Sequence, residues 1–263
     1  MIGQYRFKNY LSSWKVPPQF IILQGEIGSG RTTLINKLKE KYKFNFIICG
    51  TSVDEVREII NLCYNLSQPT FYVFFNGDKL SMSAKNALLK IVEEPPKNAY
   101  FIMRVENPII DTLRNRSFYY IMENYTPSDL KTFYKENGKE ILFDKYGTIC
   151  KNIGQIKVFL NSPFEEIINY CDTIITMISQ VAQGNIFNIT NKLNLKDEND
   201  KWDVNIFINI LEWSLNNKYT ETKEDKYFQA IFRINNLRNQ LRINGVNKQI
   251  AFDNLLLGLK DLL

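Results

Sequence analysis

The stretch Gly25-Glu26-Ile27-Gly28-Ser29-Gly30-Arg31-Thr32-Thr33 decides the fold of this chain. It follows an apolar run, Phe20 to Leu23, and it precedes a helical pattern, Leu34 to Lys41. A strand, a glycine-rich loop and a helix in this order form the usual setting of a phosphate-binding loop. Backbone N–H groups in such a loop, together with the N-terminus of the helix, attract a phosphate. We therefore prefer a phosphate-binding loop to a glycine-rich turn without a ligand.

The residues of this loop predict a nucleotide as the ligand. The candidate nucleotide-binding residues are Gly25, Gly28, Ser29, Gly30, Arg31, Thr32 and Thr33. The Thr32 hydroxyl is the expected ligand of a magnesium ion, so ATP and Mg²⁺ are the cofactors that the pattern allows. Arg31 stands where the pattern has lysine. It keeps the positive charge, but a planar guanidinium reaches phosphates differently from a compact ammonium group.

The chain outside the loop alternates between apolar runs and helical patterns. Further runs that read as strands are 44–48, 71–75, 100–105 and 118–122. Helices are expected after Ser52 or Asp54 and after Ser81 or Ser83, and Pro95-Pro96 ends the second of them. Alternating strands and helices predict an α/β fold with a parallel sheet. Ligands of such sheets bind beyond the carboxyl ends of the strands, where the loop lies.

The strand signals end after residue 123, and the rest of the chain is expected to be helical. A short helical region, 124–163, has expected breaks at Gly138, Gly147 and Gly154. Apolar stripes at helical spacing follow in 167–178, 207–215, 228–241 and 251–263. We therefore predict three domains: a nucleotide-binding type of domain over 1–123, a small helical domain over 124–163 and a helical bundle over 164–263.

Composition limits the class of protein. The 263 residues carry a net charge of +5, which is compatible with a nucleic acid partner but does not require one. Cys49, Cys63, Cys150 and Cys171 lie far apart and the chain has no histidine, so zinc is not expected and reduced thiols are. Neither a membrane span nor a signal peptide is evident, and a cytoplasmic location is expected.

The sequence "SAKNALLKIVEEPP" begins at Ser83. It resembles the bacterial clamp-loader family of AAA+ proteins, and further motifs resemble specifically the delta-prime type of that family. "NAYFIMRVENP" resembles its sensor-1 strand and implies Asn107 as a nucleotide sensor, and "TLRNRS" resembles "TIRSRC" and implies Arg116 as an arginine finger. Gly154-Gln155-Ile156-Lys157 is similar to the sensor-2 helix, with Lys157 in place of arginine. The ending "NGVNKQIAFDNLLLGL" resembles the collar of delta-prime members.

The resemblance implies a subunit of a sliding-clamp loader in DNA replication. Such subunits form a ring through their collars, open a sliding clamp and place it on primed DNA. The implied partners are other clamp-loader subunits, the clamp and DNA bound through its phosphates without sequence preference. Arg116 would stabilise charge on the ATP of a neighbouring subunit. Candidate DNA contacts, which are equally well explained as solvated lysines, are Lys37, Lys39, Lys41, Lys85 and Lys90.

The third strand departs from the family pattern. The family ends this strand with Asp-Glu, which holds the metal and positions the attacking water, and here the two positions carry Phe75 and Asn76. Phe75 cannot bind a metal, Asn76 cannot accept a proton, and Asp78 lies beyond the strand. Together with Arg31, these changes predict weak or lost ATP hydrolysis, because single losses at such sites reduce rates by orders of magnitude.

Three alternatives remain open at this stage. The first is an active clamp-loader ATPase in which Asp78 or a neighbouring subunit supplies the missing acid. The second is a nucleotide-binding interaction module in a viral or mobile-element replication system. The third is an α/β-plus-helical protein whose motifs are relics.

Overall fold

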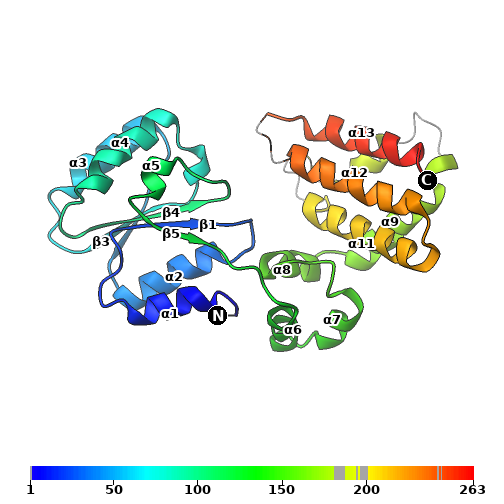
Figure 1. Cartoon of the computed structure of the whole chain (residues 1–263), viewed down its shortest axis with the longest axis horizontal. Helices are drawn as coiled ribbons and strands as arrows, with labels where there is room; N and C mark the ends of the chain where they lie inside the picture. The colour runs from blue at the N-terminus through cyan, green and yellow to red at the C-terminus, as the bar shows by residue number, and fades with distance from the viewer. Residues whose placement is uncertain (1, 181–186, 194, 196–200, 242, 244) are drawn as a thin grey trace. The chain divides into compact units, whose positions relative to one another are not determined.

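The computed structural model consists of two compact units. It describes residues 2–180, 187–193, 195, 201–241, 243 and 245–263 (Figure 1). The first unit contains residues 1–133 together with 152–154, and the second contains 134–151 together with 155–263. The three-domain division at 123 and 163 stays a prediction.

The first unit is built on a five-stranded parallel sheet with the order β2-β3-β4-β1-β5. The strands are β1 (Phe20–Gln24), β2 (Asn45–Ile48), β3 (Thr70–Phe74), β4 (Ala99–Val105) and β5 (Phe118–Ile121). Leu23 of β1 pairs with Arg104 of β4 on one side and with Tyr120 of β5 on the other. The carboxyl ends of the strands therefore meet at one edge, and the predicted α/β class and all five predicted strands are confirmed.

Helices cover both faces of this sheet (Figure 1). On one face lie α1 (Tyr5–Ser13) and α2 (Arg31–Tyr42), and on the other lie α3 (Val53–Cys63), α4 (Met82–Glu93) and the short α5 (Asp111–Arg114). Successive residues of β1 alternate between the two cores, because side chains alternate along a strand. The buried core residues of β1 are Phe20, Ile21, Ile22 and Leu23.

The sequence located two helix starts correctly and missed one helix. Ser52 forms a capping box with Glu55 at the start of α3, and the Ser81 side chain accepts the N–H of Ala84 at the start of α4. Helix α1 was not predicted, and Phe7 is its one buried residue. A 3₁₀ turn, η1 (Gly77–Lys79), follows β3.

Three short helices follow the sheet: α6 (Pro127–Glu136), α7 (Glu140–Tyr146) and α8 (Ile153–Asn161). The breaks expected at Gly138 and Gly147 are confirmed. The break expected at Gly154 is wrong, because Gly154 lies in the first turn of α8. The reason for a glycine there is a close backbone contact with the loop after β1.

The second unit is helical, as predicted for the C-terminal part. Its longer helices are α9 (Phe164–Met177), α11 (Val204–Thr222), α12 (Asp225–Leu241) and α13 (Lys248–Lys260), and 3₁₀ turns are η2 (Ile178–Gln180) and η3 (Phe187–Lys192). Arg238 of α12 donates a hydrogen bond of 2.9 Å to Asn209 of α11. Among the described residues, none of the helices is long and apolar enough to cross a bilayer.

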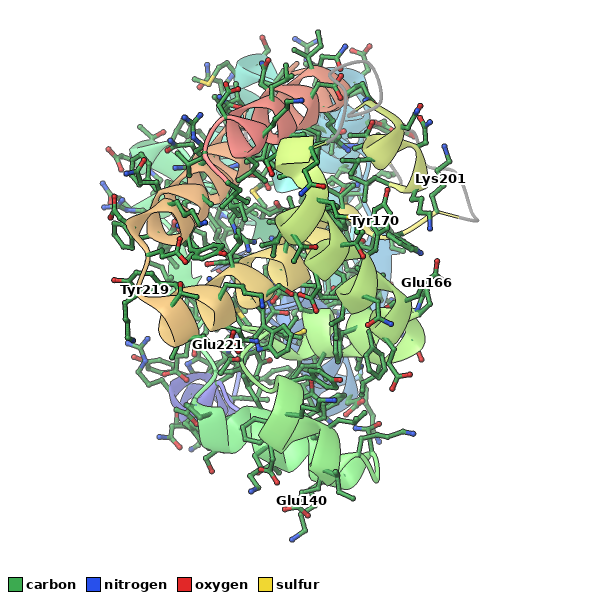
Figure 2. All side chains as sticks on the ribbon, turned by 90° about the vertical axis from the view of Figure 1, so that its right-hand side faces the viewer. Glu140, Glu166, Tyr170, Lys201, Tyr219 and Glu221 are labelled. Atoms are coloured by element: carbon green, nitrogen blue, oxygen red, sulfur yellow. The ribbon has the colours of Figure 1, made fainter. Side chains whose placement is uncertain are left out.

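The end of η3 is fixed to α9 by a lysine. The Lys192 ammonium group lies 3.4 Å from a carboxylate oxygen of Glu166 and 4.7 Å from the centre of the Tyr170 ring. Both partners belong to α9 (Figure 2). Because the pair is partly exposed, it orients the turn more than it stabilises the unit.

Candidate phosphate-binding site

The loop between β1 and α2 has the backbone shape that its sequence predicts. Gly28 and Gly30 have φ angles of +86° and +99°, in the left-handed region that glycine adopts without strain. The N–H of Ser29 donates to the carbonyl of Glu26 over 3.1 Å. These turns place the N-terminus of α2 at the carboxyl edge of the sheet, where Thr32 and Thr33 are exposed.

The loop is held by hydrogen bonds from Gln4, in the N-terminal segment, and from Tyr125, which follows β5. The Ser29 carbonyl accepts hydrogen bonds from the Tyr125 hydroxyl at 3.1 Å and from the Gln4 amide at 3.5 Å. Gln4 also donates to the carbonyl of Glu123 and accepts its N–H, over 2.8 and 2.9 Å. Gln4 is 2 % exposed and was not predicted as a site residue, although it belongs to the opening Ile2-Gly3-Gln4 that precedes the site.

The start of α8 contacts the tip of the loop. The N–H of Gly154 donates to the carbonyl of Gly28 over 3.1 Å, and the Asn152 amide donates to the carbonyl of Ile27 over 3.2 Å. A Cβ atom on Gly154 would lie 2.2 Å from the Cα of Gly28, so the contact requires glycine. Asn152 is a further residue that the sequence did not reveal.

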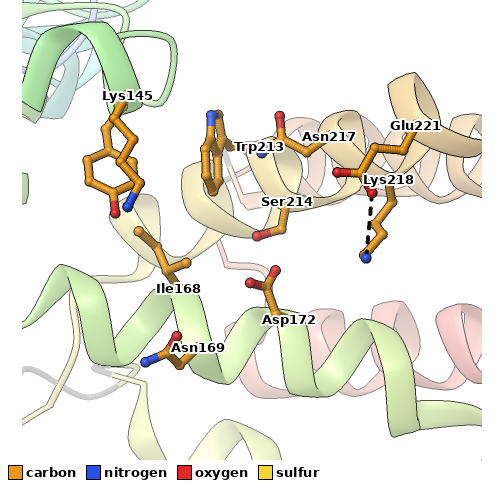
Figure 3. Close-up of a pocket in the computed structure, with 10 residues that line it drawn as sticks. Lys145, Ile168, Asn169, Asp172, Trp213, Ser214, Asn217, Lys218 and Glu221 are labelled. Carbon is orange, nitrogen blue, oxygen red and sulfur yellow. Dashed lines mark ion pairs between the residues drawn. The ribbon is translucent and has the colours of Figure 1, made fainter.

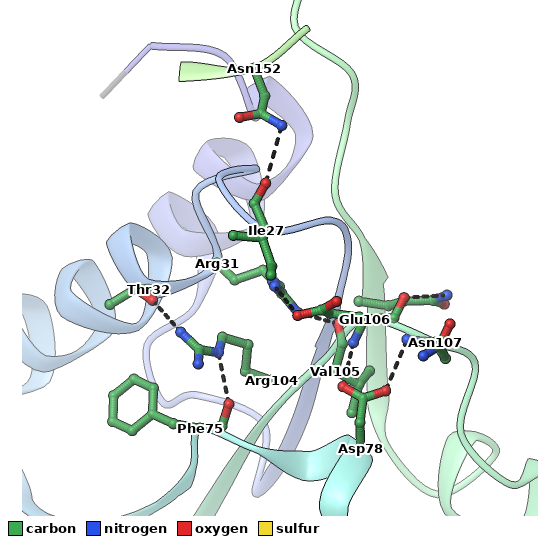
Figure 4. Close-up of polar contacts among 11 residues, drawn as sticks. Ile27, Arg31, Thr32, Phe75, Asp78, Arg104, Val105, Glu106, Asn107 and Asn152 are labelled. Atoms are coloured by element: carbon green, nitrogen blue, oxygen red, sulfur yellow. Dashed lines mark hydrogen bonds and ion pairs between the residues drawn. The ribbon is translucent and has the colours of Figure 1, made fainter. Parts of the chain in front are cut away.

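Arg31 is buried and directed toward the end of β4 (Figure 4). Its Nη1 donates to the carbonyl of Val105 over 2.6 Å, and its Nη2 lies 3.6 Å from a carboxylate oxygen of Glu106. Burial lowers the pKa of the Arg31 guanidinium, and the Glu106 carboxylate opposes this shift. Both branches of the guanidinium therefore have partners within the fold.

Arg104 of β4 connects the loop helix to the end of β3. Its Nη1 donates to the Thr32 hydroxyl over 2.9 Å, and its Nε donates to the carbonyl of Phe75 over 2.8 Å. The guanidinium carbon lies 5.2 Å from the centre of the Phe75 ring. Sequence reasoning missed this role. The available signal was a charged residue inside an otherwise apolar strand.

Asp78 has backbone partners for both of its carboxylate oxygens. They accept the N–H groups of Glu106 and Asn107 over 2.7 and 3.0 Å (Figure 4). Asn107, the predicted sensor, thus meets Asp78 through its backbone, and its side chain is exposed. The contact joins η1 to the turn after β4.

The residues around Thr32 do not fit a magnesium ion. The Thr32 hydroxyl accepts a hydrogen bond from a cation, and Phe75 and Asn76 carry no carboxylate at the end of β3. Among the residues that the structure describes, no three acidic, cysteine or histidine side chains are grouped so as to hold a metal ion. Mg²⁺ prefers octahedral oxygen ligands, usually including carboxylates, and this arrangement does not supply them.

Arg116 lies apart from the loop residues. Its Nη2 pairs with Glu93 of α4 over 2.8 Å, and its Nη1 donates to the carbonyl of Thr112 over 3.1 Å. The side chain is 41 % exposed. The residue lies just before β5, which is one of the two edge strands of the sheet. Lys157 is exposed on α8 in the second unit, and its proposed place near a nucleotide stays a prediction.

The lysines of α2 have local partners. Lys37 pairs with Glu40 over 2.6 Å, Lys39 lies over the Phe46 ring, and Lys41 donates to the carbonyl of Trp14 over 2.7 Å. On α4, Lys85 is half-buried and Lys90 is exposed, and neither has an ion-pair partner within the described part of the chain. Their assignment to DNA stays a prediction.

The cysteines and one pocket lie outside this site. Cys49, Cys63, Cys150 and Cys171 are buried free thiols. The second unit has a pocket of about 310 Å³ between α7, α9 and α11, in which Ser214 and Asp172 lie across from each other (Figure 3). None of the predicted site residues lines it, and the sequence did not indicate it.

Comparisons with known proteins agree with the motifs. A sequence model of the family described as "DNA polymerase III, delta subunit" matches residues 34–126. The chain is 26% identical over 240 residues to the DNA polymerase III subunit delta' of Buchnera aphidicola subsp. Baizongia pistaciae, which covers 80% of this chain and 70% of that protein. It is 34% identical over 90 residues to the gamma subunit of Buchnera aphidicola subsp. Schizaphis graminum, covering 32% of this chain and 25% of that protein.

A solved structure shares the fold. The DNA polymerase III gamma subunit-related protein of Thermotoga maritima superposes with a TM-score of 0.54 at 15% identity, over 98% of each chain. At this identity the likeness is one of fold alone. The chain is therefore similar in sequence to DNA polymerase III subunits named delta' and gamma, and similar in fold to the gamma subunit-related protein.

Proposed function

We propose that this chain is a delta-prime-like subunit of a sliding-clamp loader, which lends Arg116 to the ATP site of a neighbouring subunit and hydrolyses ATP weakly or not at all. The relatives named as delta' and gamma subunits support assembly with other clamp-loader subunits. Contact with the sliding clamp and primed DNA, and action in the cytoplasm of a cell or of an infected host, are parts of the same proposal.

One observation carries the proposal: the chain combines an exposed arginine near an edge strand with a separate loop whose surroundings do not suit a metal ion. Arg116 is 41 % exposed next to the edge strand, where a second subunit has access to it. The Thr32 hydroxyl accepts a hydrogen bond from Arg104, and the residues around it do not form a metal site. An arginine that stabilises the charge of a phosphoryl transfer in another subunit needs only to reach the ATP site of that subunit.

The active-ATPase alternative is weakened by Asp78. Both oxygens of this carboxylate already accept backbone N–H groups, so it is held away from the role of metal ligand or base. A viral interaction module remains the alternative of another class. That alternative predicts no association with a sliding clamp or with collar-forming subunits.

The test is ATP turnover by the reconstituted complex with the wild-type chain and with Arg116→Ala. We expect Arg116→Ala to reduce turnover by roughly a thousandfold, because arginine fingers contribute that much in related phosphoryl transfers. Thr32→Ala should leave turnover nearly unchanged, because the chain's own loop is not the hydrolytic site.

Arg114→Ala is the matched control. Arg114 lies two residues away, is 47 % exposed and pairs with Asp111, so its removal deletes a similar surface charge. Size-exclusion chromatography should show intact complexes for all three variants. The proposal fails if the isolated chain hydrolyses ATP and Thr32→Ala abolishes that activity, or if Arg116→Ala and Arg114→Ala have the same effect.

A further inference from the structure

The ion pair between Arg116 and Glu93 joins two separate elements. Glu93 is the last residue of α4, whereas Arg116 lies in the turn between α5 and β5. The Arg116 Nη2 atom lies 2.8 Å from a carboxylate oxygen of Glu93. Arg114, two residues earlier, pairs with Asp111 on its own short helix over 3.4 Å. Of these two arginines, Arg116 thus has its carboxylate partner on another element.

Both terminal nitrogen atoms of the Arg116 guanidinium have acceptors within this chain. Nη1 donates to the carbonyl of Thr112 over 3.1 Å, while Nη2 contacts Glu93. An arginine that binds a phosphate in a bidentate way uses two parallel N–H groups of its planar fork. Glu93 therefore competes with a phosphate for the same donors, and its negative charge also opposes the approach of a phosphate.

The place of Glu93 at the end of α4 does not favour the helix itself. The C-terminus of a helix carries the negative end of its dipole, so a carboxylate in the last turn is unfavourable there. Arg116 neutralises this charge. The two segments are held together by apolar packing, because Val92 of α4 and Leu113 of α5 belong to one buried core. This core keeps the Glu93 carboxylate next to Arg116.

We propose that Glu93 is a positioning residue for Arg116, which holds the guanidinium against α4 and so limits its delivery to the ATP of a neighbouring subunit. Engagement of that ATP then requires the ion pair with Glu93 to open. This role rests on the proposed donation of Arg116 and adds a restraint to it. The two side chains are 41 % and 49 % exposed, so the pair restrains the arginine weakly and in a salt-dependent manner.

ATP turnover by the reconstituted complex with Glu93→Gln tests this role. The substitution keeps the shape of the side chain and removes its charge. We expect turnover at low salt to rise about two- to fivefold, since exposed ion pairs have interaction free energies of that order. The ratio of Glu93→Gln to wild-type turnover should fall toward one as salt is added, because salt screens the pair in the wild-type chain. A general loss of structure would not produce a gain that salt removes.

Glu94→Gln is the matched control, because Glu94 is the next residue, is exposed and carries the same charge. It should turn over ATP like the wild-type complex at every salt concentration. A second comparison combines Glu93→Gln with Arg116→Ala. The double variant should be no faster than Arg116→Ala, since Glu93 acts only through the arginine.

The outcomes distinguish the role of Glu93 from that of Arg116. If Arg116→Ala leaves turnover unchanged, the proposed function fails and the role of Glu93 fails with it. If Arg116→Ala lowers turnover but Glu93→Gln behaves like Glu94→Gln, or is slower than the wild type, the role of Glu93 alone is overturned. The same conclusion follows if the gain persists at high salt or in the Arg116→Ala background.

Discussion

Arg31 illustrates what the exchange of lysine for arginine does to a phosphate-binding loop. A lysine ammonium group is a compact donor, whereas the guanidinium presents a fixed fork. In this chain one branch of the fork meets the carbonyl of Val105 and the other faces the carboxylate of Glu106. The residue therefore holds the loop helix against β4, and the positive charge stays close to the site.

The buried thiols predict how stability depends on pH. Burial raises the pKa of Cys49 and of Cys150 to about 12, and that of Cys63 to about 11, from an ordinary value of 9.0. Above about pH 9 the unfolded chain releases protons that the folded chain keeps, so the free energy of unfolding should fall as pH rises toward about 12. Below about pH 9 these thiols are protonated in both the folded and the unfolded chain, so they do not lower the free energy of unfolding there.

Denaturant midpoints measured at increasing pH check this expectation. Each thiol should cost on the order of 1 kcal/mol for every pH unit above 9. Cys150→Ala should therefore lose stability less steeply than the wild-type chain. Equal slopes for the two proteins would show that this thiol does not contribute to the alkaline loss.

At the residue scale, the sequence predicted which residues form the loop but not where their side chains point. The glycines follow from spacing alone, because backbone shape determines their role. The Thr32 hydroxyl was expected to bind a magnesium ion and instead accepts a hydrogen bond from Arg104. Arg104 reaches Thr32 because the pairing of β1 with β4 places it opposite Leu23. Strand register between distant segments depends on the whole sheet, and no local pattern contains it.

At the scale of elements, α8 and the loop are joined through two glycines. Gly154→Ala should destabilise the first unit by about 1–3 kcal/mol, because the new methyl group would collide with the backbone of Gly28 and overpacked contacts have such costs. Thermal and denaturant unfolding measure this loss. Any ATP binding by the loop should weaken in parallel.

Val158→Ala is a suitable control for that change, since Val158 lies on the same helix and is 43 % exposed. Its cost should be small, as expected for an exposed position. If Gly154→Ala were as stable as Val158→Ala, the backbone contact between Gly154 and Gly28 would not be formed in solution.

The elements that the sequence predicted correctly are those with a strong period or a strong cap. Strands β1, β3 and β4 are mostly buried apolar runs, while β2 and β5 are apolar runs at the edges of the sheet whose side chains are mostly half-buried or exposed. Helices α3 and α4 begin with serine caps. Helix α1 packs through an aromatic contact, in which the centre of the Phe7 ring lies 5.0 Å from the centre of the Tyr120 ring. A partner more than a hundred residues away leaves no trace in the local pattern.

At the scale of the whole molecule, each of the two units has its own buried core. Chains of this kind often unfold in more than one step. We expect two denaturant transitions, because Phe74 belongs to the core of the first unit and Phe207 to that of the second, each 0% exposed. Phe74→Ala should shift one transition and Phe207→Ala the other, each by about 3–5 kcal/mol.

Fluorescence and circular dichroism, recorded along one denaturant series, measure both transitions. The two variants serve as controls for each other, because the residue type and the burial are the same. A single transition that both variants shift equally would contradict independent cores.

The division of the first unit along the chain has a consequence for synthesis on the ribosome. The loop emerges early, but residues 152–154, which contact its tip, emerge only after β5, α6 and α7. Folding during synthesis proceeds from the N-terminal part of the chain. The nascent chain can therefore form the whole sheet before Gly154 is available to contact the tip of the loop. The loop between β1 and α2 is thus synthesised early, but it is among the last parts of its unit to form all of its contacts.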